Sequence, residues 1–322
     1  MQVTGLRLRR RSISYQAPYQ EIDPVKHLIL PIALASLAAA CSSPKEDGKH
    51  EEASAAPETG AAGDDAVQEI GGAFTSSIPA VAFEAADRLP EAPASAASQS
   101  ECANLIKAPQ SPAARQVVKA GWGLTGEGRI GKYRAVSFAG SFEPGTSGSC
   151  AVGKGNVAIF EGEKIVAIAY VPATGKRTIA GIVPFEEDAL RIWDGDLLSV
   201  PLADIRVAEG RGLTIEKPAA REMACGGGTP VPNIYGMPIT RARKLLEKSG
   251  WDPVGNGDGA DREDPREAAL AEAGVKEVAS CSGTGFGFCS YDYKRPEAAL
   301  AVTTVGDGAD PSVSDYAVRC GG

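Results

Sequence analysis

Histidine is almost absent from this chain of 322 residues: the only two, His27 and His50, precede the region in which strands and helices are predicted. Histidine is the commonest general base and transition-metal ligand in proteins. Its absence from the predicted folded region leaves carboxylates, Lys, Tyr and cysteines for chemistry. The sequence therefore predicts no cofactor, no metal site and no catalytic residue, although a pair of carboxylates could still hydrolyse a glycoside.

The chain also lacks an excess of basic residues and a long apolar segment. Its 33 Lys and Arg face 41 Asp and Glu, which gives a formal net charge of -8. Nucleic-acid binding needs clustered basic residues, so no nucleic-acid partner is expected. No segment after residue 41 approaches the length of roughly 20 apolar residues that a transmembrane helix requires.

An apolar run at residues 28–40 ends at Cys41. The run is too short to span a bilayer, it follows Lys26, and it closes on three alanines where a signal peptidase could cleave. This pattern resembles a bacterial lipoprotein signal. The resemblance implies that Cys41 carries a lipid such as palmitate and anchors the protein to a membrane. An ordinary secretory signal is the alternative, and both imply export.

The residues that follow indicate the membrane and the compartment. Ser42 and Ser43 come directly after Cys41, with no Asp at the second position. By analogy with Gram-negative sorting rules, this predicts the outer membrane, with the protein facing the periplasm or the cell surface. The whole chain looks like an envelope lipoprotein of a proteobacterium.

Composition divides the chain into five segments. Residues 1–24 are interpreted as an extension that is not part of the natural protein, because translation from Val25 gives a normal signal. Residues 25–40 are the signal peptide. Residues 41–100, rich in Ala, Glu, Ser, Gly and Pro, predict a disordered tether. Residues 101–222 predict a β-rich module, and residues 223–322 an α+β module.

The cysteines fit an oxidising compartment, because six remain once Cys41 is assigned to the lipid. We expect them to form three disulfides: Cys102 with Cys150, Cys281 with Cys289, and Cys225 with Cys320.

The β-rich module shows six or more short strand patterns joined by tight turns. They predict a mostly antiparallel fold, either a small barrel or a sandwich, with one short helix at residues 113–120. The GxGxxG pattern at Gly121–Gly126 leads into a strand, so a dinucleotide site is rejected. The turn around Ser147 resembles that of a serine protease nucleophile, but no histidine can serve as its base.

Several acidic residues lie beside turns in this module and are the candidates for a carboxylate-based hydrolase. Solvated hairpin rims are the preferred interpretation of these residues: Glu186, Glu187, Asp188, Asp194 and Asp196.

The α+β module opens with Val231-Pro-Asn and a helix pattern that ends at Gly250. Ile239, Ala242, Leu245 and Leu246 share one helix face. This segment of about 25 residues resembles the start of a PASTA domain, a small module of penicillin-binding proteins and envelope kinases. The resemblance implies helices packed on a small antiparallel sheet, and a family that often recognises peptidoglycan fragments. The chain departs from that family in three ways: it has one copy of the module instead of several, it has an acidic insertion, and it has cysteines.

The insertion contains a second predicted helix, with Asp264 as its N-cap, Pro265 at its first position and Gly274 after its end. The acidic loop at residues 255–261 does not match the ligand spacing of an EF-hand, so a solvated turn is preferred to a calcium site.

The leading hypothesis is a non-enzymatic envelope lipoprotein that binds cell-wall peptidoglycan or an envelope protein. The candidate ligand-binding residues are three cations, Arg241, Lys244 and Lys248, with rings from Tyr235, Trp251 or Phe288. The alternative for these residues is a solvated basic face with rings in the core. The rival functions are a disulfide-stabilised hydrolase inhibitor or stress factor, and a carboxylate-based hydrolase.

Overall fold

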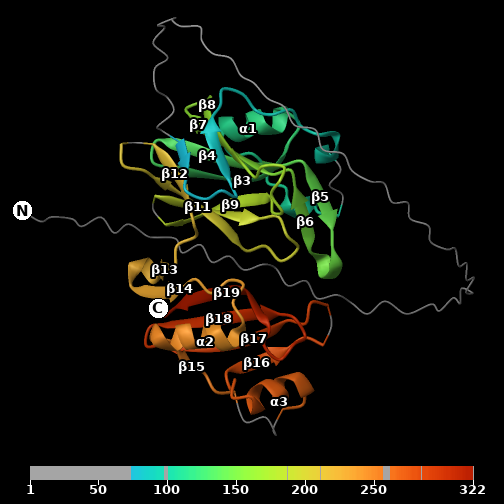
Figure 1. Cartoon of the computed structure of the whole chain (residues 1–322), viewed down its shortest axis with the longest axis vertical. Coiled ribbons are helices and arrows are strands. Elements are labelled where there is room, and N and C mark those ends of the chain that lie inside the picture. The colour runs from blue at the N-terminus through green and yellow to red at the C-terminus, as the bar shows by residue number, and fades with distance from the viewer. Residues whose placement is uncertain are drawn as a thin grey trace, which may run out of the picture. The chain divides into compact units, whose positions relative to one another are not determined.

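The computed structural model describes residues 74–97, 101–186, 188–210, 212–256, 262–283 and 285–321. The fold is mostly β, as predicted, with strands in several sheets and with short helices (Figure 1). They all fall within one compact unit, so the predicted division into two modules is not confirmed. No helix in these ranges is long and apolar enough to cross a membrane. Cys41 and the predicted signal lie outside the described ranges.

Two five-stranded sheets contain most of the strands between residues 74 and 216. The strand orders are β2-β8-β7-β4-β3 and β1-β12-β11-β10-β9. Neighbouring strands pair antiparallel, except that β1 and β12 are parallel. The bounds are β1 (Phe74–Ser76), β2 (Ala82–Ala85), β3 (Gly123–Ile130), β4 (Tyr133–Ala139), β7 (Asn156–Glu161), β8 (Lys164–Tyr170), β9 (Ile179–Glu186), β10 (Ala189–Asp194), β11 (Pro201–Val207) and β12 (Leu213–Glu216).

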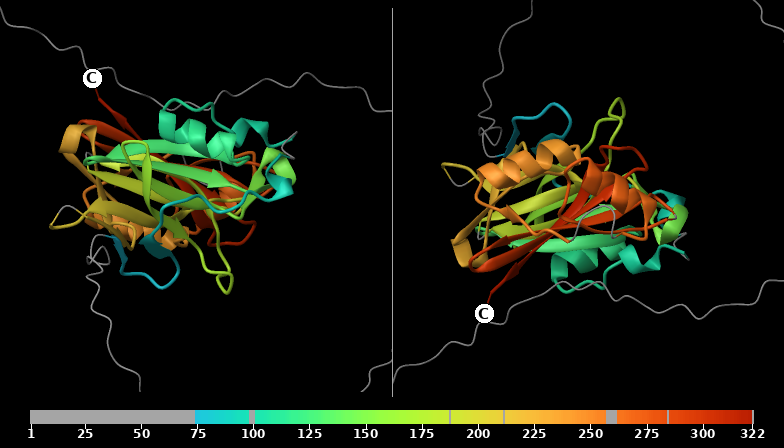
Figure 2. Two further views of the ribbon diagram at one scale, coloured as in Figure 1. Left: turned by 90° about the horizontal axis from the view of Figure 1, so that it is seen from above. Right: turned by 90° about the horizontal axis from the view of Figure 1, so that it is seen from below.

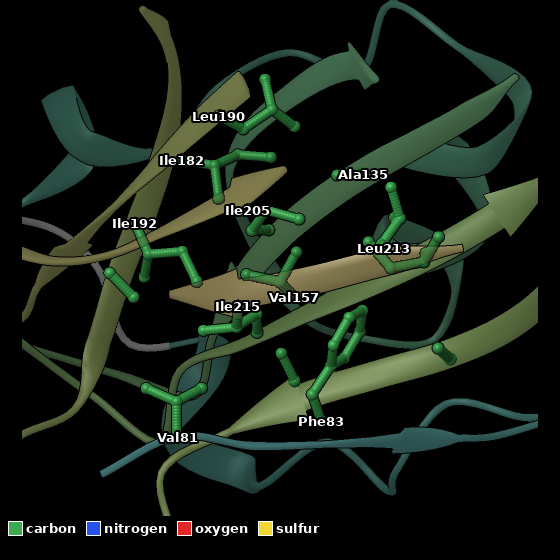
Figure 3. Packing of buried hydrophobic residues seen from close by; sticks show 14 of the residues in the cluster. Val81, Phe83, Ala135, Val157, Ile182, Leu190, Ile192, Ile205, Leu213 and Ile215 are labelled. Carbon is green, nitrogen blue, oxygen red and sulfur yellow. The ribbon is translucent and has the colours of Figure 1, made fainter. Parts of the chain in front are cut away.

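A hydrophobic core lies between these two sheets. Alternate residues of a strand point to one face, so Leu190 and Ile192 of β10 are both fully buried. Figure 3 shows them in one cluster with Val157 and Phe83, which come from the other sheet. The sheets approach one another where β3 contacts β9 and where β1 contacts β2. No ladder joins these edges among the described strands, so the closed small barrel, one of the two predicted forms, is wrong.

Gly126 of β3 lies where the edges of the two sheets come together. A Cβ added to Gly126 would lie 2.8 Å from the backbone oxygen of Ile182 in β9, so a larger residue would push the strands apart. The glycine-rich segment continues as strand β3 and not as a helix. This confirms the predicted strand, which is the reason that a dinucleotide site was rejected.

The folded region begins earlier in the chain than predicted. Residues 41–100 were expected to be a tether, but β1 and β2 pair with the edges of the two large sheets. Phe74, Ile78, Val81 and Phe83 belong to the core between them. These strands are only three and four residues long and lie in a segment rich in Ala, Ser and Pro, so the sequence gives little local signal for them.

A short helix covers the outside of the first sheet, and a hairpin contacts β9 of the second. α1 (Pro112–Lys119) is capped by Ser111, whose hydroxyl accepts from the Ala114 N–H, and it packs on β3 and β4. Figure 2 shows α1 lying along that sheet. β5 (Ser141–Pro144) and β6 (Cys150–Gly153) form the hairpin. Single turns of 3-10 helix occur at η1 (Ala94–Ala97), η2 (Ala103–Leu105), η3 (Thr146–Gly148) and η4 (Cys225–Gly227).

The last hundred residues contain the two predicted helices and a further antiparallel sheet (Figure 1). Its strand order is β15-β17-β18-β19, with β16 paired to β17, and β13 pairs with β14 beside it. The bounds are β13 (Arg221–Ala224), β14 (Thr229–Pro232), β15 (Asp252–Pro253), β16 (Val278–Cys281), β17 (Cys289–Arg295), β18 (Ala298–Val305), β19 (Ser312–Cys320), α2 (Ile239–Lys248) and α3 (Pro265–Glu272). Asp264 caps α3 through the Arg266 and Glu267 N–H groups, as predicted.

Three disulfides join the six described cysteines, and their pairing is the one predicted. Cys102 is bonded to Cys150, Cys225 to Cys320, and Cys281 to Cys289. The Cys225–Cys320 bond joins η4 to the end of the last strand, so it closes the largest loop of the three.

Candidate functional site

The exposed face of α2 carries the three cations that the sequence singled out. Ile239, Ala242 and Leu246 are fully buried on the opposite face, which leaves Arg241, Lys244 and Lys248 exposed. Within the described part of the chain, no ion pair uses any of these three cations. Residues three or four apart are neighbours on a helix surface, so the three form one row of positive charge. We call this the α2 row.

The helix that presents the α2 row is held firmly at its start. Asp310 accepts from the N–H of Thr240 at 3.0 Å and from its hydroxyl at 2.8 Å. The Ile239 N–H also donates to the Pro311 carbonyl at 2.9 Å. At the other end, Gly250 takes a positive φ of 81°, a conformation that favours glycine and ends the helix.

A partly buried ion pair holds the middle of α2. Arg243 donates from Nε to Glu277 Oε1 at 2.8 Å, and Glu277 is completely buried. Tyr293 donates its hydroxyl to the same oxygen at 2.8 Å. Burial alone would lower the pKa of Arg243, but the hydrogen bond and charge of Glu277 raise it above its usual value. Burial, together with Glu277, raises the pKa of Tyr293. Arg243 is therefore a structural cation, unlike the cations of the α2 row.

The predicted aromatic residues do not extend the α2 row. Trp251 is 0% exposed, and its Nε1 donates to the Pro230 carbonyl at 3.1 Å, so its ring belongs to the core. Phe288 is half-buried against Phe286, with ring centroids 5.8 Å apart. Tyr235 is half-buried in another aromatic cluster. The candidate site consequently reduces to its cations.

Tyr235 packs between Trp193 of β10 and Tyr316 of β19. The ring centroids lie 5.3 Å from Trp193 and 4.5 Å from Tyr316. Its hydroxyl donates to Asp315 Oδ1 at 3.3 Å. Burial is the main cause that raises the pKa of Tyr235 and of Tyr316, so both phenols stay neutral and donate hydrogen bonds.

A buried ionic network lies beside these rings and was not foreseen from the sequence. Arg191 of β10 contacts Asp204 of β11 and Glu222 of β13, and Tyr316 donates to Glu222 at 3.1 Å. The signal that could have revealed it is a charged residue, Arg191, inside an apolar strand pattern. Each carboxylate already has a cation, so the network connects strands rather than offering a free acid pair.

Two of the acidic residues considered for hydrolysis, Asp194 and Glu186, are paired with arginines. Asp194 is 4% exposed and accepts from Arg177 and from the Val200 N–H, so the predicted solvated rim is wrong for this residue. Glu186 accepts from Arg206 at 2.8 Å. Asp196 accepts from the Leu197 N–H at 2.6 Å. Glu187 lies outside the described residues.

Among the residues that the structure describes, one group of side chains has the proximity of metal ligands, namely Asp264, Glu267 and Cys281. Cys281 is bonded to Cys289 and has no thiolate to offer. Asp264 caps α3, and Glu267 accepts from the Cys281 N–H at 2.7 Å. This group is explained by helix capping. Residues 257–261 of the acidic loop lie outside the described ranges.

Comparison with known proteins gives no further guide to the site. No family model matches this chain, and no match was found among curated proteins or among solved structures.

Proposed function

We propose that this protein is a non-enzymatic lipoprotein of the cell envelope that binds an anionic cell-wall glycan, peptidoglycan in particular, through the α2 row. One observation carries the proposal: Arg241, Lys244 and Lys248 are exposed on a helix that is firmly packed, and no described partner neutralises them. Cations held in a row on a rigid element favour a ligand with repeated negative charge.

Two further features support this proposal. The helix and sheet of the last hundred residues are consistent with the PASTA-like α+β arrangement that the sequence resembles, in a family that often recognises peptidoglycan. Three disulfides suit an oxidising compartment outside the cytoplasm. Lipidation at Cys41 would keep the protein at the outer membrane, where the wall is within its reach.

Sedimentation with purified peptidoglycan tests the α2 row. Replacement of Arg241 and Lys244 together by Glu should weaken binding about tenfold at low salt, which corresponds to roughly 1.4 kcal/mol. The difference should shrink at high salt, because exposed charges are screened.

The chain provides a matched control for this experiment. Arg115 and Lys119 are exposed cations on α1, and their replacement by Glu changes the net charge by the same amount. This control should sediment like the unaltered protein. Equal losses in both variants would indicate nonspecific charge attraction. No sedimentation at low salt would contradict the proposal and leave an envelope-protein partner or an inhibitor as the better function.

A further inference from the structure

Three adjoining hollows form one groove beside β8. Their volumes are about 330, 530 and 380 Å³. The first two share Ala85 and Ala86, and the second and third share Asn156 and Tyr170. The groove is therefore continuous, and we call it the β8 groove. No residue of α2 lines it, so it is a site separate from the α2 row.

The β8 groove has a wall that is anchored to the sheet. The wall is the segment after β2, and its Ala86 N–H donates to the Val166 carbonyl of β8 at 3.2 Å. Further along, the Nε1 of Trp122 donates to the Pro90 carbonyl at 3.1 Å. Ile168 of β8 is 8% exposed and forms part of the floor. The hollows lie between fixed elements, as is usual for preformed binding sites.

Tyr170 stands where the second and third hollows meet. Its ring is half-buried, and a hydrogen bond to Glu84 is the main cause that raises the pKa of its hydroxyl. The ring is apolar on its face and polar at its tip, which suits a ligand that has both kinds of surface. A sugar ring has such surfaces, because its C–H groups lie on one face and its hydroxyls around the edge.

Asn156 provides polar groups at the same junction. Its Nδ2 donates to the Lys154 carbonyl at 3.1 Å, and no described hydrogen bond uses its amide oxygen. An amide offers both donors and acceptors, and the Glu84 carboxylate adds further acceptors. The hydroxyl groups of a ligand could donate to these acceptors and accept from these donors. The second hollow carries charges of both signs, Glu84 and Asp87 with Arg88, so no single sign dominates beside Tyr170. Lys164 lines the first hollow, and Lys154 and Arg177 line the third.

The position of the groove argues against an extended peptide. A peptide that joins a sheet needs an unpaired strand edge for its main-chain hydrogen bonds. The edge of β8 is not available, because residues Ala82–Ala85 of β2 pair with residues 167–170 of β8; the outer side of β2, the last strand of the sheet, is the edge that stays unpaired among the described strands. A ligand in the groove would therefore contact mainly side chains and few free main-chain groups. We propose that it binds a linear, uncharged, hydroxyl-rich glycan, with one sugar ring stacked on Tyr170.

Calorimetric titration with two defined probes, cellotetraose and the N-acetylglucosamine tetramer, tests this proposal. At least one probe should bind the purified protein. Tyr170→Ala should weaken that binding about tenfold, whereas Tyr170→Phe, which keeps the ring, should weaken it less. The variant with Glu at residues 241 and 244 should bind the probe unchanged, which separates this site from the α2 row.

A second variant covers the case in which Tyr170→Ala does not fold. Asn156→Ala combined with Glu84→Gln keeps the ring and should also weaken binding. Absence of binding by both probes at millimolar concentration overturns the proposal, as does binding that neither variant reduces. Binding that requires removal of residues 41–73 also overturns it, because the chain's own segment would then be the occupant.

Discussion

Arg191 and Asp204 form a buried bidentate ion pair between neighbouring strands. Nε of Arg191 donates to Oδ1 of Asp204 at 2.8 Å, and Nη2 donates to Oδ2 at 3.1 Å. Their side chains are 3% and 0% exposed. The guanidinium also lies 4.2 Å from the ring centroid of Phe185. Because Arg191 also contacts Glu222, the pair links strands β10 and β11 to β13.

Replacement of Arg191 by Met should lower the free energy of unfolding by about 3 to 5 kcal/mol, because buried Asp204 would lose its bidentate partner and keep only Arg206, whose Nη2 lies 3.9 Å away. Arg134→Met is the control, since Arg134 is 31% exposed and pairs with Glu127, and its replacement should cost about 1 kcal/mol or less. Chemical denaturation of the two variants checks this. Equal and small losses would contradict a structural role for the Arg191 pair.

Phe83→Ala should destabilise the protein by about 3 to 5 kcal/mol, as for other large core residues. Phe83 is 8% exposed and contacts Phe74, with ring centroids 5.4 Å apart. The exposed neighbour Glu84 provides the control, and its replacement by Ala should change stability little. If Phe83→Ala has no effect on the melting temperature, the segment before residue 101 is not part of the core.

The disulfides should contribute unequally to the free energy of unfolding, because they close loops of different length. Cys225 and Cys320 are 95 residues apart, whereas Cys281 and Cys289 are 8 apart. Chain entropy predicts about 4.7 kcal/mol for the first bond and about 2.6 kcal/mol for the second. Paired replacement by Ala, followed by denaturation, measures both. The reverse order would show that strain or residual structure outweighs loop entropy.

Tyr293 should make stability depend on pH above about pH 10, the pKa of tyrosine in an unfolded chain. Its pKa is raised in the folded protein, first by burial and then by Glu277. The unfolded chain therefore loses this proton at a lower pH than the native state, and stability falls as pH rises. Tyr293→Phe should reduce that slope between pH 9 and 11. An unchanged slope in denaturation experiments would contradict this assignment.

Cys41→Ser should release the protein from the membrane fraction and leave unprocessed precursor, if Cys41 carries the lipid. Fractionation and immunoblotting against the mature length provide the measurement. Soluble and normally processed unaltered protein would instead indicate an ordinary secretory signal.

Local interactions allowed the sequence alone to predict α2, α3 and several strands. Gly250 ends α2 through its positive φ, and Asp264 caps α3 through its own carboxylate, so both signals act within a few residues. The cysteine pairing was also predicted correctly. The three cations of the α2 row were predicted to share a helix face, and the structure exposes them because the apolar residues occupy the opposite face.

Only the tertiary structure decided which residues are buried together. β1 and β2 are too short to form alone and depend on edges supplied by β12 and β8, more than 80 residues away. Trp251 became a core residue because the Pro230 carbonyl accepts its indole N–H. The Arg191 network and the β8 groove likewise combine residues from distant strands. Their existence depends on long-range packing, which no local pattern in the sequence specifies.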